Sequence, residues 1–142
     1  MVRSFAADVT RWTKKTKLSG EVVLRKVAFD GYRGLLFRSP VDTGRFRGNW
    51  RISIGFTDRT TTEATSSAGP GAPPTTGEAS QAILALGRVR WRDSIHISNS
   101  LPYAEVLEAG SSNQAPNGIL SQTFHELRAN VHRNVVAVSR RR

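Results

Sequence analysis

Two segments in which apolar and polar residues alternate constrain the fold of this chain most. In residues 45–56 every second residue is apolar or glycine, and residues 89–98 follow nearly the same pattern. Such alternation is typical of β-strands buried on one face only. The apolar residues elsewhere recur at intervals of three and four, which is typical of amphipathic helices. The chain is therefore predicted to be an α+β protein, in which a small antiparallel sheet of long half-buried strands packs against N-terminal and C-terminal helices.

The predicted helices flank these strands. Residues 4–38 are expected to form two helices: a basic amphipathic one over 4–17, and a second one with Ser19 as a possible cap. Pro40 ends the second helix, because the residue before a proline is pushed out of the helical region. Three more helices are predicted over residues 78–87, 102–109 and 120–139.

Two loops separate these elements. Residues 57–77 contain no large apolar side chain, so this segment cannot offset the entropy of ordering itself. It is predicted to be a long mobile loop, or an arm that orders against a neighbouring subunit. Residues 110–119 are polar but carry Pro116 and Asn117-Gly118, which fix a turn, so this second loop is suited to contact a partner. All of residues 1–142 are expected to form a single domain.

The charge of the chain is strongly basic and unevenly distributed. Lys and Arg number 21 against 11 acids, and residues 1–51 alone hold twelve of these basic residues against four acids. Such an excess indicates a polyanion nearby, either nucleic acid or an acidic protein surface, although a solubility surface has the same composition. The chain has no cysteine, which excludes disulfides and thiolate zinc sites and fits a reducing cytosol. No apolar run is long enough for a signal peptide or a membrane span, so no membrane association is expected.

If the two strands share one sheet, its open face is basic. The predicted face carries Arg45, Arg47, Arg51, Arg90 and Arg92. The strand aromatics fall on the opposite, buried side: Phe46, Trp50, Phe56 and Trp91. A sheet that binds single strands needs aromatics on its open face for bases to stack on, so an RNA-reading module is disfavoured. What remains is attraction to phosphates or carboxylates that does not depend on base sequence.

One motif suggests an enzyme. Asp42-Thr43-Gly44 is the signature of aspartic proteases, in which two carboxylates activate a water molecule. A single copy requires a homodimer, Arg45 replaces a small residue, and no buried strand precedes the motif. The histidines His96, His125 and His132 lack a third ligand at metal-site spacing, and no phosphate loop is present. We therefore expect a protein without catalytic residues, metal, cofactor or small-molecule substrate.

Four stretches of the sequence together suggest a family. They are SPVDTGRFRGNW at 39–50, IHISNSLPYA at 95–104, LEAGS at 107–111 and QAPNG at 114–118. In this order they resemble the small tail-completion and neck proteins of tailed bacteriophages, of the gene-product-ten-like tail-component family of lambdoid phages. The resemblance implies a non-enzymatic α+β structural protein of the virion, which forms a ring at the head–tail junction through which the genome passes. It also implies that the chain lies in the host cytoplasm during assembly.

These expectations assign roles to particular residues. The five sheet arginines, or the N-terminal lysines, are predicted to face the DNA channel or an acidic neighbour. Contacts with adjoining subunits of a homo-oligomer are predicted for the 57–77 arm and for Tyr103, Gln114, Pro116 and Asn117. The other expected partners are phage neck, connector and tail proteins and, without sequence preference, double-stranded DNA. Two alternatives stay open: a DNA-binding protein that acts alone and a dimeric aspartic protease.

Overall fold

The computed structural model describes residues 5–16 and 20–140. Within these residues, five α-helices and a two-stranded antiparallel sheet confirm the predicted α+β class. Lys17 and Ser19, the predicted helix cap, lie outside the described residues. In chain order the elements are α1 (Phe5–Thr16), α2 (Gly20–Arg38), the short 3-10 helix η1 (Arg47–Asn49), β1 (Arg51–Ile54), α3 (Thr76–Leu86), β2 (Ile95–Ser98), α4 (Ala104–Glu108) and α5 (Leu120–Arg140).

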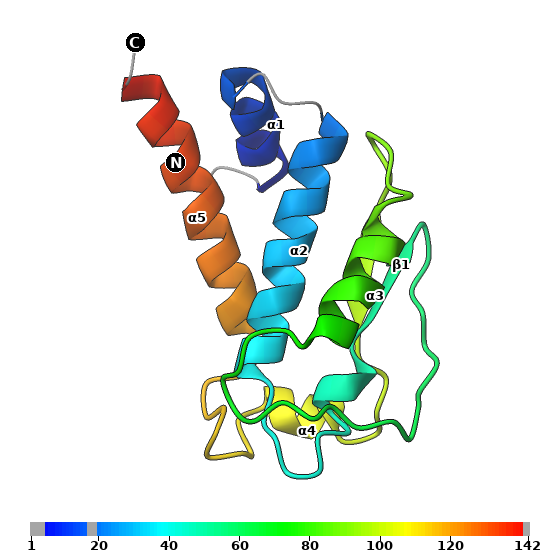
Figure 1. Ribbon diagram of the computed structural model, residues 1–142. Coiled ribbons are helices and arrows are strands. Elements are labelled where there is room, and N and C mark those ends of the chain that lie inside the picture. Colours follow the sequence, from blue (N-terminus) through cyan, green and yellow to red (C-terminus); the bar gives the residue numbers. More distant parts are fainter. Residues whose placement is uncertain (1–4, 17–19, 141–142) are drawn as a thin grey trace.

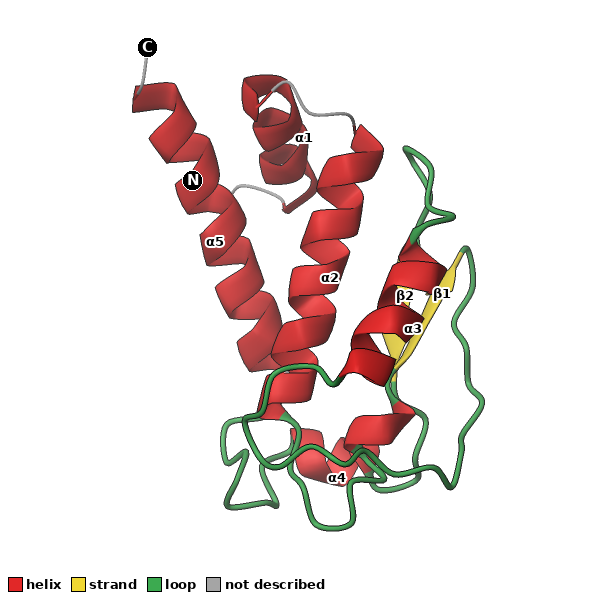
Figure 2. Ribbon diagram, viewed as in Figure 1, coloured by secondary structure: helices red, strands yellow, loops and turns green. Residues whose placement is uncertain are grey.

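Three helices pack together along one side of the molecule (Figure 1). α1 and α2 both contact α5, and α2 and α5 run in opposite directions. α3 packs against α2 and β1, so that the small sheet lies behind α3 in Figure 2. α4 and the loops around it close the end of the molecule at which α5 begins. None of the described helices is long and apolar enough to cross a lipid bilayer.

Two apolar clusters form the core of the described part of the chain. The smaller one holds α1 on the bundle through Val9, Trp12, Val23, Val27 and Val131. The larger one joins the end of α2 to the rest of the chain through Tyr32, Leu35, Leu36, Phe46, Trp50, Ala82, Leu101, Ala115 and Ile119. Here the indole Nε1 of Trp50 donates to Ser39 Oγ (2.8 Å), which donates to the carbonyl of Leu35 (2.6 Å). The residue that follows α2 therefore provides the acceptor that a buried tryptophan needs.

The strands are shorter than the alternation predicted. Each has four residues, and the register pairs Arg51 with Ser98 and Ile54 with Ile95. Residues 45–50 form a turn and η1 instead of a strand, because Gly48 N–H donates to the carbonyl of Gly44 (3.0 Å) and Asn49 N–H to that of Phe46 (3.1 Å). Ile52 and Ile97 pair across the sheet and contact the larger cluster, as predicted. The burial predicted for two aromatics is wrong: Phe56 is 61% exposed and Trp91 is 40% exposed.

The long loop forms no helix or strand up to residue 75, as predicted, but its backbone is held at several points. Ser66 N–H donates to the carbonyl of Gly44 (2.9 Å), and Thr62 N–H donates to Asn49 Oδ1 (2.8 Å). Ser98 Oγ donates to the carbonyl of Asp58 (2.6 Å), which fixes the start of the loop to the sheet. Its mobility stays a prediction, whereas these contacts show that it docks on its own chain.

Candidate anion-binding surface

The five arginines predicted to share one sheet face lie at two ends of the sheet. Arg45 and Arg47 precede β1, whereas Arg90 and Arg92 precede β2. Because the strands are antiparallel, these pairs extend from opposite ends of the ladder, Arg51 marking one end and Ile95 the other. The prediction of a single basic sheet face is therefore wrong.

Arg47 is buried and serves the fold. Only 1% of its surface is exposed. Its guanidinium donates to both carboxylate oxygens of Glu78 (3.1 and 3.0 Å) and to the carbonyls of Ala72 (2.8 Å) and Pro73 (2.9 Å). A bidentate pair of this kind satisfies both charges away from water. Arg47 is thus not available to a partner, which corrects its predicted role.

Glu78 links this ion pair to the start of α3. Its carboxylate accepts from Thr75 N–H (2.9 Å), while Glu78 N–H donates to Thr75 Oγ1 (3.2 Å), which completes a capping box. Burial raises the pKa of Glu78, but hydrogen bonds from Arg47 and Thr75 outweigh it and hold the pKa below its usual range. Burial, together with the nearby Glu78 carboxylate, raises the pKa of Tyr32 to about 12.

Arg45 and Arg51 are also engaged or half-buried. Arg45 pairs with Glu63 (2.9 Å) and donates to the carbonyl of Thr62 (3.4 Å). The Asn49 amide donates to the carbonyls of both Arg45 (2.7 Å) and Thr62 (3.0 Å). Arg51 is half-buried in β1. Arg45 therefore holds the long loop to the residues before β1, and neither arginine is part of a free cationic row.

Three exposed arginines lie close together in sequence in the loop before β2. We call residues 87–93 the arginine loop; it carries Arg88, Arg90 and Arg92, all exposed, around the buried Val89. None of the three guanidinium groups forms an ion pair or hydrogen bond with a described residue. Arg88 was missed by the sequence analysis, although the alternation R-V-R-W-R placed it beside two predicted site residues.

Several contacts fix the shape of the arginine loop. Arg25 of α2 donates to the carbonyls of Leu86 (3.2 Å) and Val89 (3.5 Å), and Asp93 accepts from Arg90 N–H (2.7 Å). The Trp91 ring lies so close to Gly20, at the start of α2, that a Cβ there would be 2.1 Å from a ring carbon. Arg92 has φ of 77°, which turns the chain into β2. These contacts hold the loop in one shape, and its three arginine side chains are exposed to solvent.

The residues predicted to contact neighbouring subunits lie together at the other end of the molecule, around α4. Tyr103 is partly exposed and packs on Phe46, with ring centroids 6.3 Å apart. The Gln114 side chain accepts from Val41 N–H (2.8 Å) and donates to the carbonyl of Val41 (3.1 Å), so both of its polar atoms are used within the chain. Pro116 and Asn117 are exposed, and the Asn117 carbonyl accepts from Gln122 (3.3 Å). Contact with another subunit stays a prediction for these residues.

The LEAGS stretch builds the start of α5. The Glu108 carboxylate accepts from the backbone N–H groups of Ile119 (2.8 Å), Leu120 (2.8 Å) and Ser121 (3.1 Å). A carboxylate at this position satisfies the unpaired donors of the first helical turn and the positive end of its dipole. Burial raises the pKa of Glu108, but these backbone hydrogen bonds lower the pKa by more, so it lies below its usual range.

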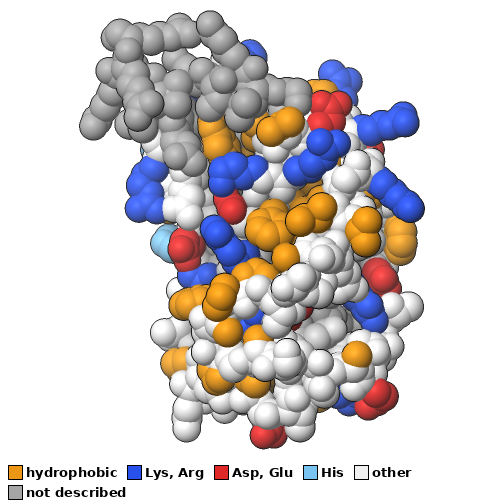
Figure 3. All heavy atoms as spheres, viewed as in Figure 1, with side chains coloured by type: hydrophobic (Ala, Val, Ile, Leu, Met, Phe, Trp, Pro, Cys, Tyr) orange, Lys and Arg blue, Asp and Glu red, His pale blue; other side chains and the backbone are white. Residues whose placement is uncertain are grey.

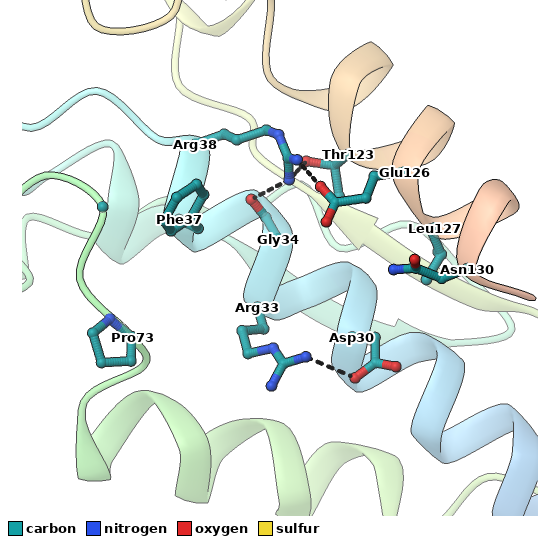
Figure 4. A pocket seen from close by; sticks show the side chains of 11 residues that line it. Asp30, Arg33, Gly34, Phe37, Arg38, Pro73, Thr123, Glu126, Leu127 and Asn130 are labelled. Carbon is teal, nitrogen blue, oxygen red and sulfur yellow. Dashed lines mark hydrogen bonds and ion pairs between the residues drawn. The ribbon is translucent and has the colours of Figure 1, made fainter.

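A pocket of about 400 Å³ lies between α2, α5 and the long loop (Figure 4). Its charged groups neutralise one another, because Arg33 pairs with Asp30 (3.3 Å) and Arg38 pairs with Glu126. Arg38 also donates to the hydroxyl of Thr123 (3.4 Å). The pocket therefore offers an anion less positive potential than the arginine loop does.

The residues that suggested catalysis or metal binding are either exposed or in contact with other parts of the fold. Asp42 is exposed in the corner after α2, where the Gly44 carbonyl accepts from both Gly48 and Ser66. His96 shares hydrogen bonds with Thr57 (3.0 Å) and Ser94 (3.2 Å), and His132 lies 3.9 Å from the buried Asp8. Among the described residues, no three His, Cys, Asp or Glu side chains are grouped so as to hold a metal ion.

Comparison of the chain with protein-family models, with curated proteins and with solved structures finds no match.

Proposed function

We propose that the chain is a structural subunit of a tailed-bacteriophage virion, which forms an oligomeric ring at the head–tail junction, joins head to tail and surrounds the DNA channel. The observation that carries this proposal is the arginine loop, in which Arg88, Arg90 and Arg92 are exposed and have no ion-pair partner among the described residues. Cations of this kind attract phosphates or carboxylates without reading bases. That property suits a subunit past which DNA moves in any sequence.

The positions of the family-like motifs support the proposal. Gly44, in SPVDTGRFRGNW, approaches Ser66 closely; Glu108, in LEAGS, caps α5; Gln114, in QAPNG, bonds Val41. All three determine how loops dock on the core. A resemblance based on such residues supports a shared scaffold more than a shared reaction.

The distribution of charge supports two different contact surfaces. Figure 3 shows Lys and Arg side chains mainly over the helical half of the molecule, whereas the half with α4 and the loops has few. We assign the arginine loop to the DNA channel or an acidic neighbour, and the surface with Tyr103, Pro116 and Asn117 to an adjoining subunit. Arg45 and Arg47 are not assigned to the DNA channel or to an acidic neighbour, because both are paired with carboxylates of the same chain.

Electron microscopy tests the proposal. The purified chain is mixed with phage heads and tails that both lack it, and the joined particles are imaged. The expected result is ring density at the head–tail junction, with a channel through its centre. Heads and tails that join equally well without the chain would refute the proposal.

A DNA-binding protein that acts alone is the second candidate, and the same arginine loop favours it. The salt dependence of duplex binding separates the two. A free monomer that contacts about three phosphates loses affinity with a log–log slope of about −3. Tight duplex binding by the monomer would favour this candidate, whereas weak binding until the ring forms would favour the neck protein. The third candidate, a dimeric aspartic protease, requires that Asp42→Asn abolish peptide cleavage.

A further inference from the structure

The second half of α3 exposes two large apolar side chains, which is unusual for a helix on a protein surface. Ala82 and Leu86 point into the core, yet Ile83 is 63% exposed and Leu84 is 75% exposed. Beyond Glu78, which is engaged by Arg47, α3 has no charged residue. The exposed residues just before them, Ser80 and Gln81, are polar, as is usual on a surface helix, so the exposed Ile83 and Leu84 indicate a local apolar patch that another molecule covers.

Beside this face is an apolar hollow. It has a volume of about 520 Å³ and lies between α2 and α3, lined by Phe29, Ile83 and Leu86 together with Arg25, Lys26 and Gly87. Figure 3 shows hydrophobic side chains gathered over this region, with Lys and Arg side chains around them. We call the hollow, with Ile83 and Leu84, the α2–α3 groove.

A cationic hollow adjoins the α2–α3 groove. Its volume is about 500 Å³, and it shares Arg25 and Gly87 with the groove while adding Glu21, Arg88, Val89 and Arg90. The guanidinium of Arg25 donates to two neutral carbonyls and forms no ion pair with a described residue. Arg88 and Arg90 have no ion-pair partner among the described residues. The apolar groove thus adjoins a hollow in which three arginines outnumber one carboxylate, that of Glu21.

We infer that the α2–α3 groove binds an acidic amphipathic helix of a neighbouring virion protein. The apolar stripe of that helix would cover Phe29, Ile83 and Leu84, and carboxylates on its flank would pair with Arg88 and Arg90. The inference rests on the proposed function for the identity of the neighbour, and it deepens that function by naming what the arginine loop contacts.

Charge and shape select this occupant over two others. Duplex DNA would satisfy the arginines, but its phosphates offer no apolar surface to cover Ile83 and Leu84. A second copy of this chain carries a net charge of +10, and its acids are spread along the sequence and do not form an acidic helix. Two such surfaces would repel one another.

Peptide binding to the full chain tests the inference. The probe is a labelled helical peptide of about 18 residues, with Leu at i, i+3, i+4 and i+7 and Glu on the flanks, and its affinity is measured by fluorescence anisotropy. We expect the double variant Ile83→Ser/Leu84→Ser and the double variant Arg88→Ser/Arg90→Ser each to weaken binding about tenfold or more. High salt should reduce only the arginine contribution.

Matched controls lie elsewhere on the surface. Val106→Ser removes another exposed apolar side chain, 56% exposed, from α4, and Arg59→Ser removes an exposed arginine from the long loop. Both should leave the affinity unchanged. Equal binding of a peptide with Gln in place of Glu, no binding of the acidic peptide, or duplex DNA binding that depends on the arginines with no peptide preference would each overturn the inference.

The inference and the proposed function are refuted by different results. If the acidic peptide does not bind, yet the ring still forms at the head–tail junction, the inference is wrong and the proposed function stands. If heads and tails join without the chain, the proposed function is wrong whatever the peptide does.

Discussion

Arg47 and the arginines of the arginine loop occupy similar sequence surroundings but opposite physical environments. Arg47 lies in R-F-R-G-N-W and Arg90 in R-V-R-W-R, each beside a bulky residue and two positions from another arginine. Arg47 is almost completely buried against Glu78, whereas Arg90 is exposed and unpaired among the described residues. The comparison teaches that the pairing of a guanidinium, more than its local sequence, decides whether it stabilises the fold or binds a partner.

The same contrast holds for the regions around them. At the loop end of the molecule, which comprises residues 39–49, 57–75 and 110–118, polar side chains bond to the backbone of distant loops. At the arginine loop, such bonds hold the backbone, while the guanidinium groups of Arg88, Arg90 and Arg92 have no partner among the described residues. Substitutions at the loop end are therefore expected to lower the stability of the fold, whereas substitutions at the arginine loop are expected to weaken binding to a partner.

Breaking the buried pair should have the largest effect. Arg47→Ala leaves the Glu78 carboxylate buried without its cation, so we expect the free energy of unfolding to fall by about 4 kcal/mol. Urea denaturation monitored by tryptophan fluorescence measures this. Arg90→Ala, as a control, should stay within about 0.5 kcal/mol of the parent chain. Equal losses for both variants would remove the distinction between the two arginines.

A glycine pair sharpens the comparison within the loop end. Gly44 has φ of 87°, and a Cβ there would be 2.3 Å from the carbonyl oxygen of Ser66, whereas Gly55 has φ of 83° and nothing within 4 Å. Gly44→Ala should therefore cost about 3 kcal/mol, for strain plus the clash with Ser66, and Gly55→Ala only about 1 kcal/mol, for strain alone. The difference in unfolding midpoint between the two variants measures how tightly the long loop is docked.

Much of the fold was predictable because it depends on local periodicity. The ends of α1, α2 and α5 fall within about two residues of the predictions, since the helices carry apolar residues at threes and fours and Pro40 marks the end of α2. Phe46 and Trp50 misled the prediction, because residues four apart share one face of a turn as readily as one face of a strand.

The site was less predictable, because it depends on contacts between distant residues. The burial of Arg47 requires Glu78, which lies 31 residues further along the chain. The shape of the arginine loop depends on Arg25, which donates to the carbonyl of Leu86, 61 residues further along the chain. The sequence alone identified Arg90 and Arg92 as candidates, but it assigned Arg47 to the same surface and missed Arg88.

Acid should weaken the cap that Glu108 of α4 forms on α5, next to the loop end. The pKa of Glu108 is lower in the folded chain than in the unfolded chain, so the unfolded chain binds more protons in the acidic range. Its stabilising contribution is complete at neutral pH and is lost as the pH falls below about 4. Glu108→Gln should lower the free energy of unfolding at pH 7 by about 1 kcal/mol and flatten the loss of stability on the acidic side. Parallel pH profiles of variant and parent would contradict this role.

The smallest effect on stability is expected at the arginine loop. The triple variant Arg88→Ser/Arg90→Ser/Arg92→Ser should keep the free energy of unfolding within about 0.5 kcal/mol of the parent chain, because these side chains make no ion pair with a described residue. It should nevertheless elute from a heparin column at clearly lower salt. The triple variant Arg45→Ser/Arg47→Ser/Arg59→Ser, by contrast, should fold poorly, because it removes the buried ion pair of Arg47 with Glu78.

The joining of heads to tails by the triple arginine-loop variant tests the central claim most directly. The variant and the parent chain are each added to heads and tails that lack the protein, and infectious particles are counted. If the account holds, the variant folds as the parent does but yields few infectious particles. A folded variant that restores infectivity as well as the parent chain would contradict it.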